Sequence, residues 1–159
     1  MRRPRLQIIR GLPGSGKTTI ALKKFPSLLR LETDMYFTRK GKYTFTRDLN
    51  TKAVHWFKSM VKKCCKEGMD FVLTGVFAAH TERLLSTVET ALNAGYEVYI
   101  QTMTANYGNI HNVPKSHFAA MKNDFLSEGD LREVLGNVRH LHFGLMDEKI
   151  KIGGKPCKK

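Results

Sequence analysis

Cysteine is scarce in this chain of 159 residues, which contains three. Cys64 and Cys65 are adjacent in a helical pattern, where successive side chains point in different directions, and Cys157 lies in a basic segment. An odd number of cysteines without a metal-ligand spacing is typical of neither a disulfide framework nor a zinc site. The six histidines also lack the H-x-x-x-H and H-E-x-x-H patterns of zinc enzymes. We therefore expect free thiols and no zinc.

Long apolar runs are absent as well. No stretch approaches the ~18 consecutive apolar residues that a membrane-spanning helix needs. The apolar run at residues 6–9 is too short for the core of a signal peptide. Hydrophobic residues still make up 42% of the chain, which is ordinary for a globular domain and too many for a disordered one. These features predict a cytoplasmic protein that has no membrane partner.

Acidic residues are few relative to basic ones. The chain has 27 Lys and Arg against 14 Asp and Glu, which gives a formal net charge of +13. Such a charge attracts polyanions, but it does not distinguish nucleic acid from ATP or inorganic phosphate. The basic excess is spread along the sequence, and only residues 149–159 look like a solvated, flexible tail. Charge alone therefore leaves a nucleic-acid partner open.

Short apolar segments alternate with amphipathic segments, and glycine or proline ends several of them. The predicted strands cover residues 6–10, 27–33, 70–76, 96–102 and 138–143. The predicted helices cover residues 17–25, 51–67, 81–94 and 115–126, with a helical turn at 131–135. Residues 34–50 have no clear period and are predicted to be mostly loop. The alternation predicts an α/β three-layer sandwich with a mostly parallel sheet of about five strands, in a single domain over residues 1–148.

The segment Gly11-Leu-Pro-Gly-Ser-Gly-Lys-Thr18 matches G-x-x-x-x-G-K-[ST], with a predicted strand before it and a predicted helix after it. Glycines let backbone N–H groups turn toward bound phosphates, and the N-terminus of the helix adds partial positive charge. Lys17 is predicted to reach the β- and γ-phosphates, and the Thr18 hydroxyl is predicted to be a ligand of Mg²⁺. The predicted nucleotide-binding residues are Gly11, Pro13, Gly14, Ser15, Gly16, Lys17, Thr18 and Thr19.

The phosphate loop does not reveal where the phosphate goes, because kinases, ATPases, GTPases and helicases share it. The sequence contains no N-K-x-D run of the kind that reads guanine, so ATP is favoured over GTP. Aromatic and basic residues interleave at residues 36–47, a pattern typical of a groove for single-stranded nucleic acid. A hairpin or lid that packs its rings against the domain is the alternative.

The order of several motifs resembles the polynucleotide-kinase-like P-loop family. Glu32-Thr-Asp-Met-Tyr-Phe37 follows the second predicted strand and precedes Gly41-Lys-Tyr-x-Phe45 and Ala53-Val-His-Trp56; later, Asn109-Ile-His-Asn-Val-Pro114 precedes a helix that contains Met121. The resemblance covers residues 6–126 and is strongest to small stand-alone members, which are often phage-encoded. It implies a P-loop kinase fold with a lid at about 103–132. It also implies transfer of the γ-phosphoryl group of ATP, with Mg²⁺, to the 5′-hydroxyl of a polynucleotide, an oligonucleotide or a nucleotide.

The resemblance makes Asp34 the general base that acts on the acceptor hydroxyl. A carboxylate at the C-terminal end of a strand beside the phosphate loop also faces the crevice where ligands bind in such sheets. An aspartate that caps the next turn is the alternative. The resemblance places His55 near the acceptor site, although a role in helix packing is equally compatible. The candidate substrate-binding residues are Arg39, Arg47, His55, Lys115 and Lys122.

Three positions depart from the family pattern. Met35 replaces a second acid, and the third strand ends Leu73-Thr-Gly-Val76, without the carboxylate that would organise Mg²⁺ or the acceptor. Residues 106–108 offer no lid arginine, for which Lys115, Lys122 or Arg132 are candidate substitutes. These losses keep two other functions open. One is a small-molecule kinase on the same fold, and the other is a non-catalytic ATP-binding module that holds nucleic acid or a protein partner.

Overall fold

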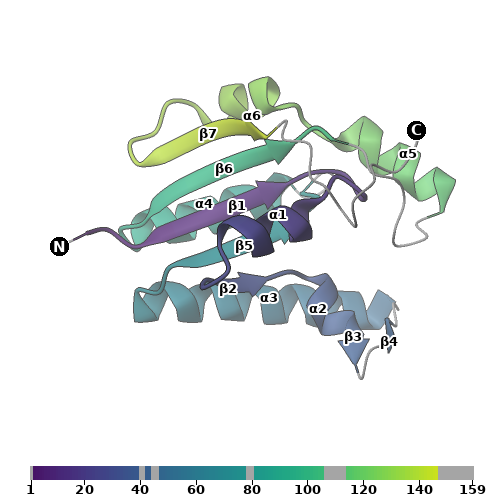
Figure 1. The fold of residues 1–159 in the computed structure, drawn as a ribbon, viewed down its shortest axis with the longest axis horizontal. Coiled ribbons are helices and arrows are strands. Elements are labelled where there is room, and N and C mark those ends of the chain that lie inside the picture. Colours follow the sequence, from purple (N-terminus) through teal and green to yellow (C-terminus); the bar gives the residue numbers. More distant parts are fainter. Residues whose placement is uncertain (1, 40–41, 44–46, 78–80, 106–113, 147–159) are drawn as a thin grey trace.

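The computed structural model describes residues 2–39, 42–43, 47–77, 81–105 and 114–146. Five strands form one sheet in the order β2-β5-β1-β6-β7, and every neighbouring pair is parallel (Figure 1). The strands are β1 (Arg5–Arg10), β2 (Leu29–Leu31), β5 (Phe71–Gly75), β6 (Glu97–Met103) and β7 (Leu141–Met146). The predicted α/β fold with a parallel, five-stranded sheet is confirmed.

Helices cover both faces of the sheet, because successive residues of a strand point to opposite sides. On one face, Ile8 and Leu73 of the sheet pack in a core with Phe57 of α3 (Arg47–Glu67) and Leu84 of α4 (Thr81–Asn93). On the other face, Ile20 of α1 (Lys17–Lys24) packs in a second cluster that contains Ile9 and Val72. Figure 1 shows α1 in front of the sheet and α4 behind it. Burial on both faces explains why these strands read as continuous apolar runs.

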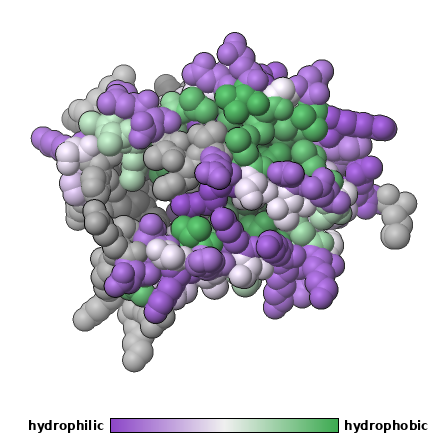
Figure 2. Space-filling view, turned by 180° about the vertical axis from the view of Figure 1, so that it is seen from behind, coloured by the Kyte–Doolittle hydropathy of each residue, from purple (hydrophilic) through white to green (hydrophobic). Residues whose placement is uncertain are grey.

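Seen from behind, most of the described surface is hydrophilic, and one hydrophobic area lies at the upper right of the view (Figure 2). Within the described residues, no helix has the length and apolarity that a membrane-spanning segment requires.

The described residues between 34 and 50 contain more secondary structure than the predicted loop. They contain the short helix α2 (Asp34–Phe37), the antiparallel pair β3 (Thr38–Arg39) and β4 (Lys42–Tyr43), and the first turn of α3. A strand of two residues is too short to show a period. The first turn of α3 is polar and includes Asp48, whose charge favours a helix N-terminus, so the apolar period begins only later.

The last elements also differ from their predicted bounds. Helix α5 (Lys115–Asp124) ends two residues early, and β7 is shifted by three residues toward the C-terminus. Helix α6 (Glu128–Leu135) is a complete helix instead of one turn. Its N-cap is Ser127, whose Oγ accepts a hydrogen bond from the Asp130 N–H at 3.1 Å. Residues 106–113 of the predicted lid and the predicted tail at 149–159 lie outside the described residues.

Candidate functional site

The phosphate loop connects the end of β1 to α1, as the motif predicts. The Gly11 N–H donates to the Gly75 carbonyl at 3.3 Å, which ties the start of the loop to the end of β5. Gly14 and Gly16 have φ values of +80° and +85°, a conformation that side chains rarely adopt. A Cβ at Gly11 would lie 2.9 Å from the Cβ of Met103, so only glycine fits there without a shift. The glycines of the motif are thus required by the path of the backbone.

Polar groups inside the loop are arranged for an anion. Lys17 begins α1 and is buried, and its Nζ donates to the Leu12 carbonyl at 3.1 Å. The Ser15 Oγ is buried and has no hydrogen-bond partner among the described residues. The first turn of α1 contains no acidic residue, so its N–H groups keep their positive potential. A buried hydroxyl without a partner beside a lysine and a helix N-terminus fits the oxygen atoms of a phosphate group.

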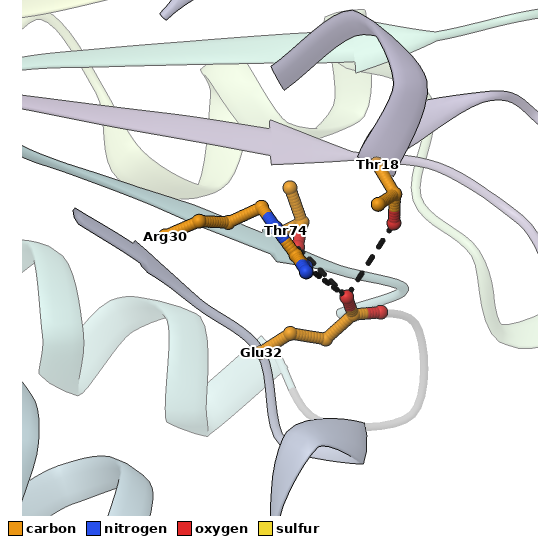
Figure 3. A network of polar contacts seen from close by, with 4 residues as sticks. All are labelled: Thr18, Arg30, Glu32 and Thr74. Atoms are coloured by element: carbon orange, nitrogen blue, oxygen red, sulfur yellow. Dashed lines mark hydrogen bonds and ion pairs between the residues drawn. The ribbon is translucent and has the colours of Figure 1, made fainter. Parts of the chain in front are cut away.

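Glu32 lies directly beyond β2 and turns its carboxylate toward α1 (Figure 3). Its Oε2 accepts a hydrogen bond from Thr18 Oγ1 at 3.5 Å and one from Thr74 Oγ1 at 3.1 Å. Arg30 Nη1 forms an ion pair with the same oxygen at 2.6 Å and also approaches Thr74 Oγ1 at 3.3 Å. Residues two apart in extended chain share a face, which places Arg30 beside Glu32. The pairing of Leu31 with Leu73 places Thr74 next to Glu32.

Glu32 supplies the kind of group that the end of β5 lacks. Thr74 stands near the end of that strand, where a carboxylate was expected from the family pattern, and its hydroxyl donates to Glu32 instead. The sequence pattern does not reveal Glu32, because its position depends on the pairing of β2 with β5, whose partners Leu31 and Leu73 are 42 positions apart in the sequence. The available signal was its place at the end of a strand that leads into the crevice.

Hydroxyl and carboxylate oxygens form a donor set that fits Mg²⁺. This ion keeps several water molecules and is usually held by one or two carboxylates together with substrate phosphates. Thr18 and Glu32 are therefore the residues that would hold it. The described residues contain no cluster of three or more His, Cys, Asp or Glu that could hold a metal ion.

Asp34 is the first residue of α2, immediately after the Glu32–Thr33 segment. The Met35 N–H donates to the Glu32 carbonyl and the Tyr36 N–H to the Thr33 carbonyl, both at 3.1 Å, so the chain turns sharply beyond β2. The backbone therefore places Asp34 beside the end of the strand. Its side chain lies outside the described part of the structure, and its role as general base stays a prediction.

Arg83 of α4 reaches the same strand end and was not among the predicted site residues. Its Nη1 donates to Thr33 Oγ1 at 3.2 Å. The side chain is half-buried, and desolvation lowers the pKa of the guanidinium from its usual value. It remains protonated at neutral pH, because the ordinary value is far above 7. No carboxylate of the described residues forms an ion pair with it, and its hydrogen bond to Thr33 holds the guanidinium at the end of β2.

A cavity of about 520 Å³ opens on the other side of the phosphate loop. Its walls come from the loop, the end of β6, helix α5 and the start of α6, including Pro13, Met103, Phe118, Lys122 and Phe125. The volume is in the range of small-molecule sites, and the lining combines apolar side chains with a few polar groups. A nucleoside whose phosphates occupy the loop would fit this position.

Arg10 supports the wall of this cavity from inside the core. It is fully buried, its Nη1 donates to Thr102 Oγ1 at 3.1 Å, and its Nη2 donates to the Leu126 carbonyl at 2.6 Å. The guanidinium carbon lies 4.0 Å from the centre of the Phe125 ring, a cation–π distance. Burial lowers the pKa of Arg10 to about 10, so it is still protonated at neutral pH. A buried cation thus connects β1 to the segment between α5 and α6.

Among the predicted substrate residues whose side chains are described, Lys122 alone lines the cavity beside the loop. Lys115 is exposed at the start of α5, and His55 is exposed on α3. Arg132, a candidate for the missing lid arginine, forms an ion pair with Glu128 and lines a different cavity. The side chains of Arg39 and Arg47 lie outside the described part of the structure.

The ring of Tyr36 does not stand free as in an open groove. It packs against Trp56 of α3 with 6.0 Å between the ring centres. This contact agrees with the alternative in which the aromatic segment packs on the domain. The side chains of the other aromatic residues of the segment, Phe37, Tyr43 and Phe45, lie outside the described part, so the predicted groove stays a prediction.

No family model matches the sequence. Among solved structures, a chain of the Pnkp1/Rnl/Hen1 RNA repair complex superposes with a TM-score of 0.64 and 16% identity, covering 84% of this chain and 47% of that chain. The APS kinase CysC of Mycobacterium tuberculosis, solved with AMPPNP and APS, has a TM-score of 0.50 and 13% identity; the match covers 94% of this chain and 92% of that chain. A chain of the PezAT toxin–antitoxin system of Streptococcus pneumoniae has a TM-score of 0.50 and 23% identity; the match covers 64% of this chain and 47% of that chain.

These similarities define the fold. The chain has the fold of the P-loop kinases, with its phosphate loop between β1 and α1. It spans about half the length of the RNA-repair chain and of the toxin–antitoxin chain that it matches.

Proposed function

We propose that the protein is an ATP-dependent kinase that transfers the γ-phosphoryl group to the 5′-hydroxyl of a polynucleotide, or of an oligonucleotide or nucleotide. One observation carries the proposal. The intact phosphate loop lies between a nucleoside-sized cavity on the β6 side and a strand end with Glu32, Asp34 and Arg83 on the β2 side. Two reactants can therefore meet at the loop.

ATP would bind with its base and sugar in the cavity and its phosphates in the loop. Backbone N–H groups, the Ser15 hydroxyl and Lys17 would bind the phosphate oxygens, and Lys17 would stabilise the charge of the transferred group. The chemistry that Mg²⁺ supplies when bound with ATP is neutralisation of phosphate charge. Thr18 and Glu32 would hold that ion.

The acceptor would approach along the end of β2. Its hydroxyl oxygen forms a bond to the γ-phosphorus while the bond from that phosphorus to the bridging oxygen of ADP breaks, and the hydroxyl proton passes to the Asp34 carboxylate. Arg83, which donates to the hydroxyl of the neighbouring Thr33, would bind a phosphate of the acceptor. An anionic acceptor also agrees with the net charge of +13. The main support for a non-catalytic module is the absence of an acid at the end of β5, and the carboxylate of Glu32 next to Thr74 favours the catalytic alternative.

The test is transfer of label from γ-labelled ATP, with Mg²⁺, to DNA and RNA oligonucleotides that carry a 5′-hydroxyl. Oligonucleotides that carry a 5′-phosphate, free nucleosides and small phosphorylated alcohols are parallel acceptors. We expect label on the 5′-hydroxyl oligonucleotides and its loss in Asp34→Asn, with ATP binding retained. Asp48→Asn, which changes an exposed aspartate of α3, is the matched control and should keep activity. Measurable ATP binding without transfer to any acceptor would contradict the proposal.

A further inference from the structure

The carboxylate of Glu32 has two oxygens in different surroundings. Oε2 receives the contacts from Thr18, Thr74 and Arg30, whereas Oε1 accepts no hydrogen bond in the described part of the structure. Figure 3 shows Oε1 directed away from Arg30 and Thr74. The residue thus combines one oxygen that is held in place with one that is available to a further ligand.

Arg30 is the counter-ion of this carboxylate. The side chains of Arg30 and Glu32 are 21% and 15% exposed, so neither charge is fully solvated. An ionised carboxylate at that depth needs a cation nearby, because removing one partner of such a pair leaves an uncompensated charge. Thr74 is neutral and can orient the carboxylate, but it cannot balance its charge. Arg30 therefore supplies the charge that a bound cation would otherwise supply.

Thr18 links the carboxylate to the nucleotide. It follows Lys17 in the first turn of α1, and its hydroxyl is the group that the motif assigns to Mg²⁺. Its contact with Glu32 Oε2 is 3.5 Å, which is long for an O–H···O bond and leaves the hydroxyl weakly held. A hard cation bound by the Thr18 hydroxyl and the Glu32 carboxylate would satisfy both groups.

We infer that Glu32 is the carboxylate that binds Mg²⁺ together with ATP, in place of an acid at the end of β5, and that Arg30 is the cation it exchanges for the metal ion. Thr74 is then the residue that orients Glu32. The inference rests on the proposed nucleotide binding. A purely structural Arg30–Glu32 pair makes a different prediction, because it would affect stability and leave the influence of Mg²⁺ on ATP binding unchanged.

The experiment measures ATP affinity by calorimetry in Mg²⁺ and in EDTA. The unmodified protein should bind ATP more tightly in Mg²⁺. Glu32→Gln should keep its affinity in EDTA and lose about 10- to 100-fold of the gain from Mg²⁺, the usual effect of losing a group that supports a metal site. Glu89→Gln, the same change at an exposed position of α4, should behave as the unmodified protein. Arg30→Met should keep the increase in ATP affinity that Mg²⁺ causes. It should reach that increase at a lower Mg²⁺ concentration, because the Arg30 guanidinium no longer competes for the carboxylate.

A second readout separates metal binding from folding. The double variant Arg30→Met/Glu32→Gln carries no uncompensated charge and should fold even where a single variant is unstable. Its increase in ATP affinity on addition of Mg²⁺ should be reduced as much as in Glu32→Gln. Paramagnetic titration of Mn²⁺ into the protein with ATP should show correspondingly weaker binding of the ion in both variants.

The outcomes distinguish this inference from the proposed function. A gain from Mg²⁺ that is unchanged in Glu32→Gln and in the double variant would overturn the role of Glu32, while the nucleotide site would stand. Absence of ATP binding by the unmodified protein in either condition would overturn the proposed function and this inference with it.

Discussion

Charged side chains have different kinds of partners at the two edges of the central sheet, the edge where the strands begin and the edge where they end. At the edge where the strands begin, Asp70 accepts the Arg5 N–H at 2.8 Å and forms an ion pair with Arg2 at 2.8 Å. Glu97 contacts both His140 and His142 at the same edge. Each of these carboxylates has two partners from another segment. They join β1 to β5 and β6 to β7, which is a contribution to stability.

At the edge where the strands end, two buried or half-buried arginines have no carboxylate partner among the residues that the structure describes. Arg10 donates to a hydroxyl and a carbonyl, and Arg83 donates to a hydroxyl. Desolvating a cation without a carboxylate is unfavourable, so these residues do not serve stability alone. Arg10 lies behind the wall of the cavity next to the phosphate loop, and Arg83 lies at the end of β2, so both flank the proposed ligand-binding region. The difference teaches that one edge holds the sheet together and the other is prepared for ligands.

Arg10→Met should give the largest effect. It tests whether Arg10 serves ATP binding or the stability of the fold. We expect ATP affinity to fall by about 2 kcal/mol, roughly 30-fold, because the wall around Phe125 and Leu126 loses its charge-assisted support. The free energy of unfolding should change by less than about 1 kcal/mol, since the lost hydrogen bonds are offset by removal of a desolvated charge. Calorimetry with ATP and urea unfolding measure the two quantities. Arg139→Met, at an exposed position, is the control. Unchanged affinity with a large loss of stability would contradict this view.

Tyr96→Phe tests the opposite edge. Tyr96 is fully buried, and its hydroxyl lies 2.9 Å from the Cys64 carbonyl and 2.7 Å from the Met69 carbonyl, to which it donates. Burial raises the pKa of this phenol, so it stays a neutral donor at physiological pH. We expect the free energy of unfolding to fall by about 1 kcal/mol while ATP affinity is unchanged. Tyr99→Phe, three residues further along the chain in β6, is the matched control. A loss of ATP affinity in Tyr96→Phe would mean that the two edges are not separate.

Glu97→Gln should give the smallest change in the free energy of unfolding, and the size of this change depends on pH. Hydrogen bonds from His142 and from His140 hold the pKa of Glu97 below its usual value. The folded protein therefore keeps this carboxylate ionised at a pH where the unfolded chain, with a pKa of about 4.3, is already protonated. Its contribution to stability is present above that pH and is lost as the pH falls through the lower, folded value. Urea unfolding between pH 7 and pH 3 should show a difference between the two proteins that disappears at the acid end. A difference that grows toward pH 3 would contradict the assignment.

Much of the fold is readable in the sequence, because it depends on local patterns. The apolar runs of β1, β5 and β6 are buried on both faces, and glycine ends several elements. The phosphate loop depends on eight consecutive residues, Gly11 to Thr18, and was placed correctly with its flanking strand and helix. Helix α6, which Ser127 caps, was predicted only as a helical turn at residues 131–135.

The remaining features depend on contacts between distant segments. Glu32 reaches Thr18 and Thr74 only because β2 pairs with β5, and Arg83 reaches Thr33 only because α4 begins beside that strand end. Neither pairing has a signature within a short window of sequence. The two-residue strands β3 and β4 were missed for a related reason, since they are held by one another and carry no period of their own.

The central place of β1 in the order β2-β5-β1-β6-β7 has a kinetic consequence. In the proposed function, a nucleoside binds in the cavity toward β6 and the acceptor binds at the strand end with Glu32 and Arg83 toward β2, so the two reactants would come to the loop from opposite sides. Neither has to leave before the other enters. A kinase built in this way forms a ternary complex and transfers the phosphoryl group directly between its two substrates. Its initial-rate plots would intersect, in contrast to the parallel lines of a ping-pong enzyme that stores the group on one of its own side chains.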